Sequence, residues 1–344
     1  MKTFRLMIIL LGISLTVNAE VLTAMRDSVP GSYNFWLYEP SNTPVVATTS
    51  TDSLSETSVD TLAQLSHGKP LIVFLHGKSL SGNDLQQVRR YGTIPALEMG
   101  LRLDAYVIAP QTSNGWSSKK VWKMVEWTIN KYPIDTNRIY VLGMSMGGYG
   151  TLNLAAAYPD KIAAAIALCG GATAKDLCGL NKLPLWIIHG TADNQVPIRC
   201  SDRVVTAMTE CGDTTRLRYD RLEDQNHSIL ARVFYMYEAY DWLFSHRLND
   251  SARVVNRDYE ITIPKLGVAY KHLHGKKRKI KTINKVSYPT ATTTSTGTQV
   301  HIIKEGDTLF ALALRYKTTV SKLCQLNGIS ETSILRIGQQ IKLP

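Results

Sequence analysis

Six short apolar segments, separated by stretches of helical pattern, fill the middle of this 344-residue chain. Apolar runs of this length that lack polar alternation are typical of parallel strands buried on both faces. Strand and helix in alternation imply right-handed crossovers and a doubly wound, mostly parallel α/β sheet with helices on both faces. The segments are residues 71–75, 105–109, 139–142, 163–168, 185–188 and, more weakly, 215–219.

Two helices and one further strand have clear patterns around these segments. Residues 121–132 and 148–158 have helical periodicity, and the second helix must end at Pro159. Residues 33–38 alternate in a way that predicts a strand at an edge of the sheet.

The first 19 residues have the pattern of a signal peptide. Lys2 and Arg5 precede an apolar run at 6–17, and small or polar residues follow up to Ala19. This run is shorter than the roughly 20 residues that span a bilayer, and no other segment is long and apolar enough to do so. We therefore expect an exported protein without a membrane span after processing, located in the periplasm, at the cell wall or outside the cell. A retained membrane anchor is the alternative.

Most of the net charge of +11 lies in one stretch, residues 251–298. This stretch holds ten Lys or Arg against Asp258 and Glu260, a net charge of +8, and it ends in a Thr-rich run. Because hydrophobic periodicity fades here, we expect a solvated linker that also contacts anionic cell-wall or membrane surfaces. An exported chain rarely meets DNA, so the charge does not indicate nucleic-acid binding. The expected organisation is a signal peptide (1–19), a large domain (20–250), a linker (251–298) and a small domain (299–344).

The five cysteines are compatible with disulfides in an exported protein. If residues 198–211 are helical, Cys200 and Cys211 lie roughly 16 Å apart along the helix, beyond disulfide reach. Cys169 and Cys178 are a candidate pair, and buried free thiols are an equal alternative. The cysteine spacing matches no zinc template, and the sequence indicates neither a metal nor another cofactor.

Residues 143–147 contain the pattern Gly-Met-Ser-Met-Gly directly between an apolar strand and a helical segment. A residue at such a sharp turn has strained backbone geometry, and side chains two residues to either side would collide, so Gly143 and Gly147 are needed there. The turn holds Ser145 at the C-terminal edge of the sheet. The following helix points its N-terminal N–H groups and positive dipole end at the serine hydroxyl. The pattern therefore predicts a nucleophilic serine.

A nucleophilic serine needs a base, and the base needs an acid that orients it. In the fold class that carries this turn, the order along the chain is serine, acid, histidine. Asp193 lies in the loop just after the strand at 185–188 and is the predicted acid. Asp176 and Asp202 are the rivals, but neither lies immediately at the end of a strand.

Among the eight histidines, His227 lies after the last predicted strand and before the final helix of the large domain. This position makes His227 the predicted base. His76 and His189 each precede a glycine at the end of a strand, where we expect a structural role in the turn. His246 follows the helical stretch 233–244, and we expect it at the surface.

The tetrahedral intermediate of acyl transfer needs N–H donors for its oxyanion. The predicted donors are the backbone N–H groups of Met146, after the nucleophile, and of Lys78, in the loop after an earlier strand. Residues 171–182 leave little chain for a lid domain, so the site should be open. Gln111 and Trp116, in the loop after the strand at 105–109, are candidate substrate-lining residues. A purely structural role for Trp116 is an equal alternative.

Residues 70–227 resemble the esterases of the prolyl-oligopeptidase-like and feruloyl-esterase-like branch of the α/β hydrolases. The matching stretches are LIVFLHG, DAYVIAPQ, NGW, DTNRIYVLGMSMGGYGTL, YPDKIAAAIALCGG and HGTADNQVP. The resemblance implies hydrolysis of a carboxylic ester, with acylated saccharides among the candidate substrates, through an acyl-serine intermediate. A serine peptidase is the alternative. The stretch before Pro70 is too short for the β-propeller of prolyl oligopeptidases, which favours the esterase.

Residues 299–344 resemble the LysM family. The matching stretches are KEGDTLFALALRY, TVSKLCQLNG and IGQQIKLP. The resemblance implies a βααβ fold that binds glycans containing N-acetylglucosamine, chiefly peptidoglycan or chitin. Gly306, Asp307 and Thr308 lie in the loop where the groove of that family would form, and they are candidate glycan contacts. Leucines at 309, 312, 323 and 326 are expected in the core.

A third interpretation is a noncatalytic cell-wall-binding protein whose hydrolase domain has lost its activity. The complete set of Ser145, Asp193 and His227, with both glycines of the turn, argues against it.

Overall fold

The structure is a computed structural model that describes residues 19–41, 68–273, 280–284, 300–303, 307, 309–316, 318–330, 333, 335 and 338–344. The predicted signal peptide up to residue 18 lies outside the described residues, as do the basic run at 274–279 and the Thr-rich run before residue 300. Gly306 and Thr308 lie outside them as well.

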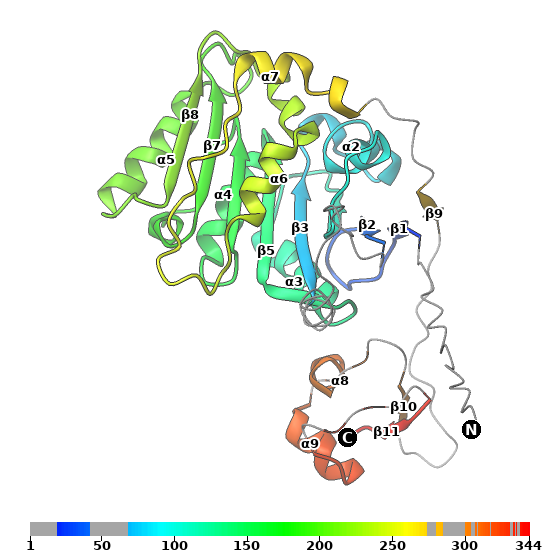
Figure 1. The fold of residues 1–344 in the computed structure, drawn as a ribbon. Helices are drawn as coiled ribbons and strands as arrows, with labels where there is room; N and C mark the ends of the chain where they lie inside the picture. The colour runs from blue at the N-terminus through cyan, green and yellow to red at the C-terminus, as the bar shows by residue number, and fades with distance from the viewer. Residues whose placement is uncertain are drawn as a thin grey trace, which may run out of the picture.

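A nine-stranded sheet in the order β8-β7-β6-β5-β3-β4-β2-β1-β9 forms the centre of the larger domain (Figure 1). The strands from β4 to β8 in this order are parallel, whereas β2 is antiparallel to both β4 and β1. The prediction of a doubly wound, mostly parallel sheet is confirmed. The strands are β1 (Val21–Met25), β2 (Phe35–Glu39), β3 (Lys69–Leu75), β4 (Tyr106–Pro110), β5 (Ile134–Met144), β6 (Ala164–Leu168), β7 (Leu185–Gly190), β8 (Leu217–Leu222) and β9 (Lys281–Ile283).

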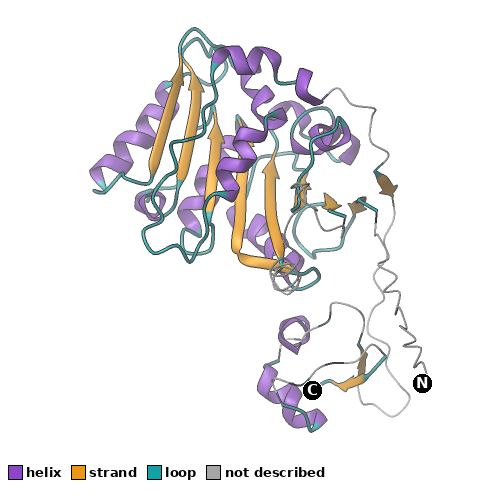
Figure 2. Ribbon diagram, viewed as in Figure 1, coloured by secondary structure: helices purple, strands orange, loops and turns teal. Residues whose placement is uncertain are grey.

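Helices cover both faces of this sheet (Figure 2). Along β3, Ile72 and Phe74 point into one core and Leu71 and Val73 into the other, as the two-residue period of a strand requires. The first core is closed by α2 (Thr93–Glu98), α6 (Tyr237–Phe244) and α7 (Ile263–Val268), and the second by α3 (Ser118–Ile129), α4 (Met146–Ala157) and α5 (Arg199–Glu210). Short 3₁₀ helices lie at Lys78–Leu80 (η1), Leu85–Arg89 (η2), Cys178–Lys182 (η3), Ser228–Tyr235 (η4) and Lys271–Leu273 (η5). None of the helices within the described ranges is long and apolar enough to cross a membrane.

The strand predicted at residues 33–38 is present, but its predicted edge position is wrong. It forms β2, which lies between β4 and β1. The extra neighbour is β1, a five-residue strand that the sequence patterns do not reveal because it directly follows the predicted signal peptide. All five residues of β1 pair with β2, so β2 is buried between two partners.

The first part of the predicted linker packs on the sheet instead of being solvated. Val255, Ile261 and Leu266 are buried in the first core. The Arg253 guanidinium donates hydrogen bonds to three backbone carbonyl groups between α4 and β6, those of Pro159, Ile162 and Ala163. Residues 251–273 therefore belong to the large domain. Their apolar residues have no regular spacing, because most of this segment is extended and irregular, and periodicity cannot detect such a segment.

One disulfide, between Cys178 and Cys211, joins η3 to the end of α5. The exclusion of a pair between Cys200 and Cys211 is confirmed, and the candidate pair of Cys169 with Cys178 is wrong. Cys169 is a buried free thiol. The true partners are 33 positions apart and meet only because η3 and α5 pack side by side, which sequence spacing does not reveal.

The C-terminal residues form a second, smaller domain with its own hydrophobic core. The elements are β10 (Val300–Ile302), α8 (Leu309–Arg315), α9 (Val320–Asn327) and β11 (Gln340–Lys342), and β10 pairs with β11 in antiparallel orientation. Leu309, Leu312 and Leu323 are buried in this core, as predicted. The order is the expected βααβ.

His246 is buried, and its prediction as a surface residue is wrong. Only 2% of the residue is exposed. Its Nδ1 donates to the carbonyl of Trp242 at 2.7 Å, and its Nε2 accepts from the N–H of Asn256 at 3.0 Å. The segment after α6 folds back over the helix and covers the ring, a long-range contact that the local sequence does not encode.

We predict that acid destabilises the large domain through three buried histidines. Burial lowers the pKa of His76 to about 4 and also lowers the pKa values of His189 and His246. These rings stay neutral in the folded protein, whereas the unfolded chain takes up protons below its pKa of about 6.5. The free energy of unfolding should therefore fall as pH decreases from 6.5, by up to about 1.4 kcal/mol per pH unit for each histidine.

Urea unfolding between pH 8 and pH 4.5 measures this slope. His246→Leu should reduce the slope by the contribution of one histidine, whatever its effect on stability at pH 8. An unchanged slope in that variant would show that His246 does not contribute to the acid sensitivity.

Candidate active site

Ser145 lies at the sharp turn between β5 and α4, with φ of 58° and ψ of −121°. Few residues other than glycine adopt a positive φ, and such strain persists only where the surroundings hold it. The Ser145 N–H donates to the carbonyl of Leu168 at the end of β6, at 2.9 Å. The turn therefore presents the serine side chain at the C-terminal edge of the sheet, at the N-terminus of α4.

The two glycines of the pattern are required by close backbone contacts. A Cβ atom on Gly147 would lie 1.8 Å from the carbonyl oxygen of Leu75, the last residue of β3. A Cβ atom on Gly143 would lie 2.4 Å from the carbonyl oxygen of Gly147. Real Cβ atoms do not approach backbone oxygens this closely, so only glycine allows the neighbouring strand to support the turn.

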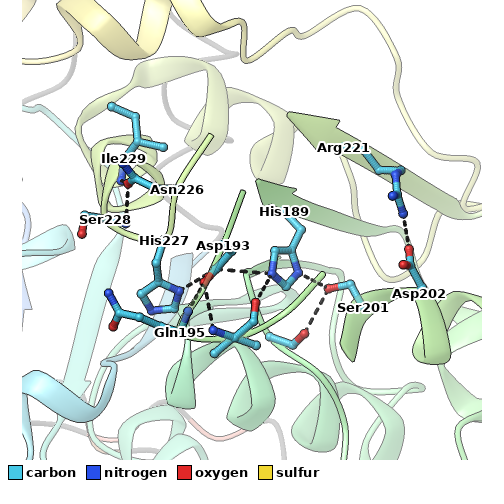
Figure 3. A network of polar contacts seen from close by, with 12 residues as sticks. His189, Asp193, Gln195, Ser201, Asp202, Arg221, Asn226, His227, Ser228 and Ile229 are labelled. Carbon is cyan, nitrogen blue, oxygen red and sulfur yellow. Dashed lines mark hydrogen bonds and ion pairs between the residues drawn. The ribbon is translucent and has the colours of Figure 1, made fainter. Parts of the chain in front are cut away.

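Asp193 and His227, the predicted acid and base, are in direct contact (Figure 3). Nδ1 of His227 donates to Oδ2 of Asp193 at 2.6 Å, and the two residues are 8% and 5% exposed. Oδ1 of Asp193 accepts from the N–H groups of Gln195 and Val196, both at 2.9 Å. This arrangement keeps the proton of a neutral imidazole on Nδ1, so that Nε2 is free to accept one.

The rival acids have other partners. Asp176 accepts from the backbone N–H of Cys178 at 2.9 Å, and Asp202 binds Arg221 and the hydroxyl of Tyr219. Both carboxylates are engaged within their own surroundings, which leaves Asp193 as the carboxylate in contact with His227.

His76 and His189, predicted as structural residues, have different surroundings. His76 accepts the N–H of Thr112 through Nε2 at 3.1 Å and thereby holds the loop after β4. His189 contacts Asp193 itself, with Nε2 lying 3.4 Å from Oδ2. The sequence patterns do not predict the contact between His189 and Asp193. The separation of four residues between the histidine and the acid is the signal that could have suggested it.

The predicted oxyanion donors line one cavity. Lys78 and Met146 are both part of the lining of a cavity of about 610 Å³. Among the described residues, the backbone N–H groups of Lys78 and Met146 have no acceptor. Both lie at N-termini of helical turns, where N–H groups are unsatisfied, so they are available to an oxyanion.

Of the candidate substrate-lining residues, Trp116 borders this cavity and Gln111 does not. The indole of Trp116 also donates to the carbonyl of His76 at 3.1 Å, so the residue has a structural contact as well. Gln111 is 5% exposed, donates to the carbonyl of Leu80 and lines a neighbouring cavity of about 520 Å³. The two cavities share the residues from Asn114 to Trp116 as a common wall.

Cys169 lies beside the acid and the base. Its Sγ, a ring nitrogen of His227 and a carboxylate oxygen of Asp193 all lie within 4.8 Å of one another. Burial raises the pKa of this thiol, which favours its neutral form. Because Oδ2 of Asp193 and Nδ1 of His227 are already hydrogen-bonded to each other, we assign no metal to this group.

In the C-terminal domain, Asp307 is engaged inside the protein. Its carboxylate accepts from Nε2 of His301 at 2.6 Å and contacts Arg315 at 3.4 Å, and its side chain is 8% exposed. This candidate glycan contact therefore has a structural role in the loop before α8. Its neighbours Gly306 and Thr308 lie outside the described residues.

Two family models match the chain. Residues 111–243 match the phospholipase/carboxylesterase family, and residues 301–344 match the LysM domain. The chain therefore joins an esterase-type α/β-hydrolase domain to a LysM domain. The family resemblance predicted for each part is confirmed.

Curated relatives of the hydrolase domain are similar over limited regions. Acetylxylan esterase A of Emericella nidulans is 45% identical over 58 residues, which cover 17% of this chain and 19% of that protein. Feruloyl esterase B of Talaromyces stipitatus is 30% identical over 170 residues, which cover 45% and 41%. The chain thus spans less than half the length of these relatives. A solved structure of a thermostable esterase, 25% identical, aligns with 67% of this chain and 63% of its own, with a TM-score of 0.49.

We predict that Gly147→Ala disrupts the hydrolase domain at its turn. The added methyl group would collide with the Leu75 carbonyl, so the melting temperature should fall and labelling of Ser145 by a fluorophosphonate should be lost. Gly267→Ala, in α7, is the control, because a Cβ there meets nothing within 4 Å. The control should keep wild-type labelling. A Gly147→Ala variant that melts and labels like wild type would contradict the packing described here.

Proposed function

We propose that this chain is an exported carboxylic ester hydrolase that acts through an acyl-serine intermediate and is directed to peptidoglycan or a related N-acetylglucosamine glycan by its LysM domain. The observation that carries the proposal is the hydrogen bond between His227 and Asp193, on the same sheet edge as the strained Ser145 turn. Serine peptidase activity is the alternative that the test below must exclude.

In the proposed reaction, Ser145 Oγ attacks the carbonyl carbon of the ester while its proton passes to Nε2 of His227. The hydrogen bond to Asp193 holds the ring in the required tautomer and stabilises the imidazolium that forms. The oxyanion is bound by the N–H groups of Met146 and Lys78, and the positive end of α4 adds to the attraction. The intermediate then collapses, the alcohol leaves with the proton from His227, and the acyl group stays on Ser145.

Deacylation repeats these steps with water. His227 takes a proton from the water as its oxygen attacks the acyl carbon, and the same two N–H groups bind the second oxyanion. The proton then returns to Ser145 Oγ, and the carboxylic acid is released. The residues required are those of acylation, so no cofactor is needed.

Two observations support an ester rather than a peptide as substrate, and a third concerns the alcohol group of that ester. The matched family is that of phospholipases and carboxylesterases, and the curated relatives described above are named as esterases of acetylxylan and feruloyl type. The cavity beside Met146 is lined by polar side chains such as Asn153 and Thr173, which suit a hydroxylated alcohol group. An acylated saccharide is therefore our preferred substrate class within the esters.

The LysM domain supports the glycan-directed part of the proposal. It has a separate hydrophobic core, so it can fold without the hydrolase domain. A tether would raise the local concentration of enzyme at wall-bound substrate without changing the kinetics on small soluble esters.

We predict that Ser145→Ala abolishes ester hydrolysis, by about 10³-fold or more, and leaves the fold intact. The variant removes the nucleophile but only one small polar atom, so its melting temperature should stay close to that of wild type. Nitrophenyl esters, feruloyl and acetyl sugars, and peptide amides are the substrates to compare. Ser118→Ala, in α3, is the control and should be fully active. Turnover of peptide amides above esters would favour the peptidase, and full activity in Ser145→Ala would exclude the mechanism.

We also predict that His227→Ala and Asp193→Ala both lower kcat, the aspartate variant less severely. Loss of the histidine removes the base, whereas loss of the acid only disorients it. Steady-state kinetics at saturating ester separates the two. A harmless His227→Ala would mean that the base is another residue.

Finally, we predict that the two domains act independently. A fragment ending near Thr290 should keep its activity on soluble esters, and residues 299–344 alone should sediment with insoluble peptidoglycan or chitin at low and high salt. The full chain with neutral residues in place of the Lys and Arg at 276–279 is the control for charge. Binding that requires those charges and disappears at high salt would assign the targeting to electrostatics instead of the LysM domain.

A further inference from the structure

His189 is enclosed between the loop that carries Asp193 and the helix α5. Its side chain has no exposed surface. Nε2 lies 2.8 Å from the carbonyl oxygen of Val196 and 3.4 Å from Oδ2 of Asp193 (Figure 3). Nδ1 lies 2.7 Å from the hydroxyl of Ser201, near the start of α5. The ring thus contacts the beginning and the end of the acid's loop and the helix behind it.

The surroundings decide which ring nitrogen carries the proton. The carbonyl of Val196 and the carboxylate of Asp193 can only accept hydrogen bonds, so Nε2 must donate. Burial lowers the pKa of His189, which favours a neutral ring. With its one proton on Nε2, the ring accepts through Nδ1 from the Ser201 hydroxyl, whose oxygen lies 2.7 Å from Nδ1 and 3.0 Å from the Gly170 carbonyl oxygen, the other acceptor within reach of the same proton. The N–H of His189 therefore points at the loop of the acid and is fixed there.

Val196 transmits this contact to the carboxylate. Its N–H donates to Oδ1 of Asp193 at 2.9 Å, and its carbonyl accepts from His189. Val196 is thus hydrogen-bonded to the Asp193 carboxylate through its N–H and to the His189 ring through its carbonyl. The other carboxylate oxygen, Oδ2, faces both His189 and the catalytic base His227.

We propose that His189 is a positioning residue, which holds Asp193 so that Oδ2 stays aligned with Nδ1 of His227. The proposal rests on the roles of Asp193 and His227 given under the proposed function. His189 does not reach the substrate, so it acts on the chemical steps through the acid. Its loss should lower kcat with little change in KM, because the acid's loop does not line the cavity beside Met146.

The test compares His189→Leu and His189→Gln in the full chain, with active sites counted by fluorophosphonate titration. We expect kcat per active site of His189→Leu to fall about 10-fold or more. This loss should be smaller than the roughly 10⁴-fold loss seen when the acid of a serine-hydrolase triad is disabled. Gln can donate to Val196 and accept from Ser201, so it should restore most of kcat. If His189→Leu does not fold, His189→Asn, which is too short to reach Val196, carries the same expectation.

His246→Leu is the matched control, because His246 is also a buried histidine with two backbone partners but no contact with the acid. It should lower the melting temperature and leave kcat per active site unchanged. A purely structural role of His189 would give the same result for His189→Leu, and that result would overturn the proposal.

A double-mutant cycle with Asp193→Ala gives a second readout. Since His189 acts through Asp193, adding His189→Leu to Asp193→Ala should cause no further loss of kcat. Additive losses would overturn the positioning role while leaving the triad intact. Full activity in Ser145→Ala would instead overturn the proposed mechanism itself, so the two failures are distinguishable.

Discussion

The close approach of the Leu75 carbonyl to Gly147 is the contact on which the site depends. It places the end of β3 directly against the turn that carries Ser145, at a separation that excludes any side chain. The strained φ of Ser145 persists because this strand on one side and the Leu168 carbonyl on the other hold the turn. The sheet therefore positions Ser145, and the following helix offers the N–H group of Met146 as one of the two proposed oxyanion donors.

The same sheet edge brings the rest of the machinery together from distant parts of the chain. Asp193 follows β7, His227 follows β8, and Lys78 follows β3, so each side chain or N–H group comes from the carboxyl end of a strand. Parallel strands place these ends at one edge, which is where open α/β sheets bind ligands. The buried His189 ring lies behind Asp193 and contacts Val196 in the same loop, so we propose that it fixes the position of the acid.

Local patterns were sufficient to predict the sheet, the serine turn, and the pairing of Asp193 with His227. Each of these depends on short-range features: apolar runs, the two glycines, and the order of residues after strand ends. The misassigned features depend on contacts between distant segments. His246 is buried by a segment that folds back over α6, Cys178 meets Cys211 through the packing of η3 on α5, and residues 251–273 pack without any regular period. The contact of His189 with Asp193 is different, because the two residues are only four positions apart and their spacing alone could have suggested it.

The most direct test of the central claim is a crystal structure of the protein after reaction with a fluorophosphonate. The account predicts phosphorus bonded to Ser145 Oγ, with a phosphoryl oxygen at about 2.7–3.1 Å from the N–H groups of Met146 and Lys78. The Nε2 atom of His227 should face the Ser145 oxygen, with Asp193 still bound to Nδ1. A label on any other residue, or a phosphoryl oxygen directed away from both N–H groups, would contradict it.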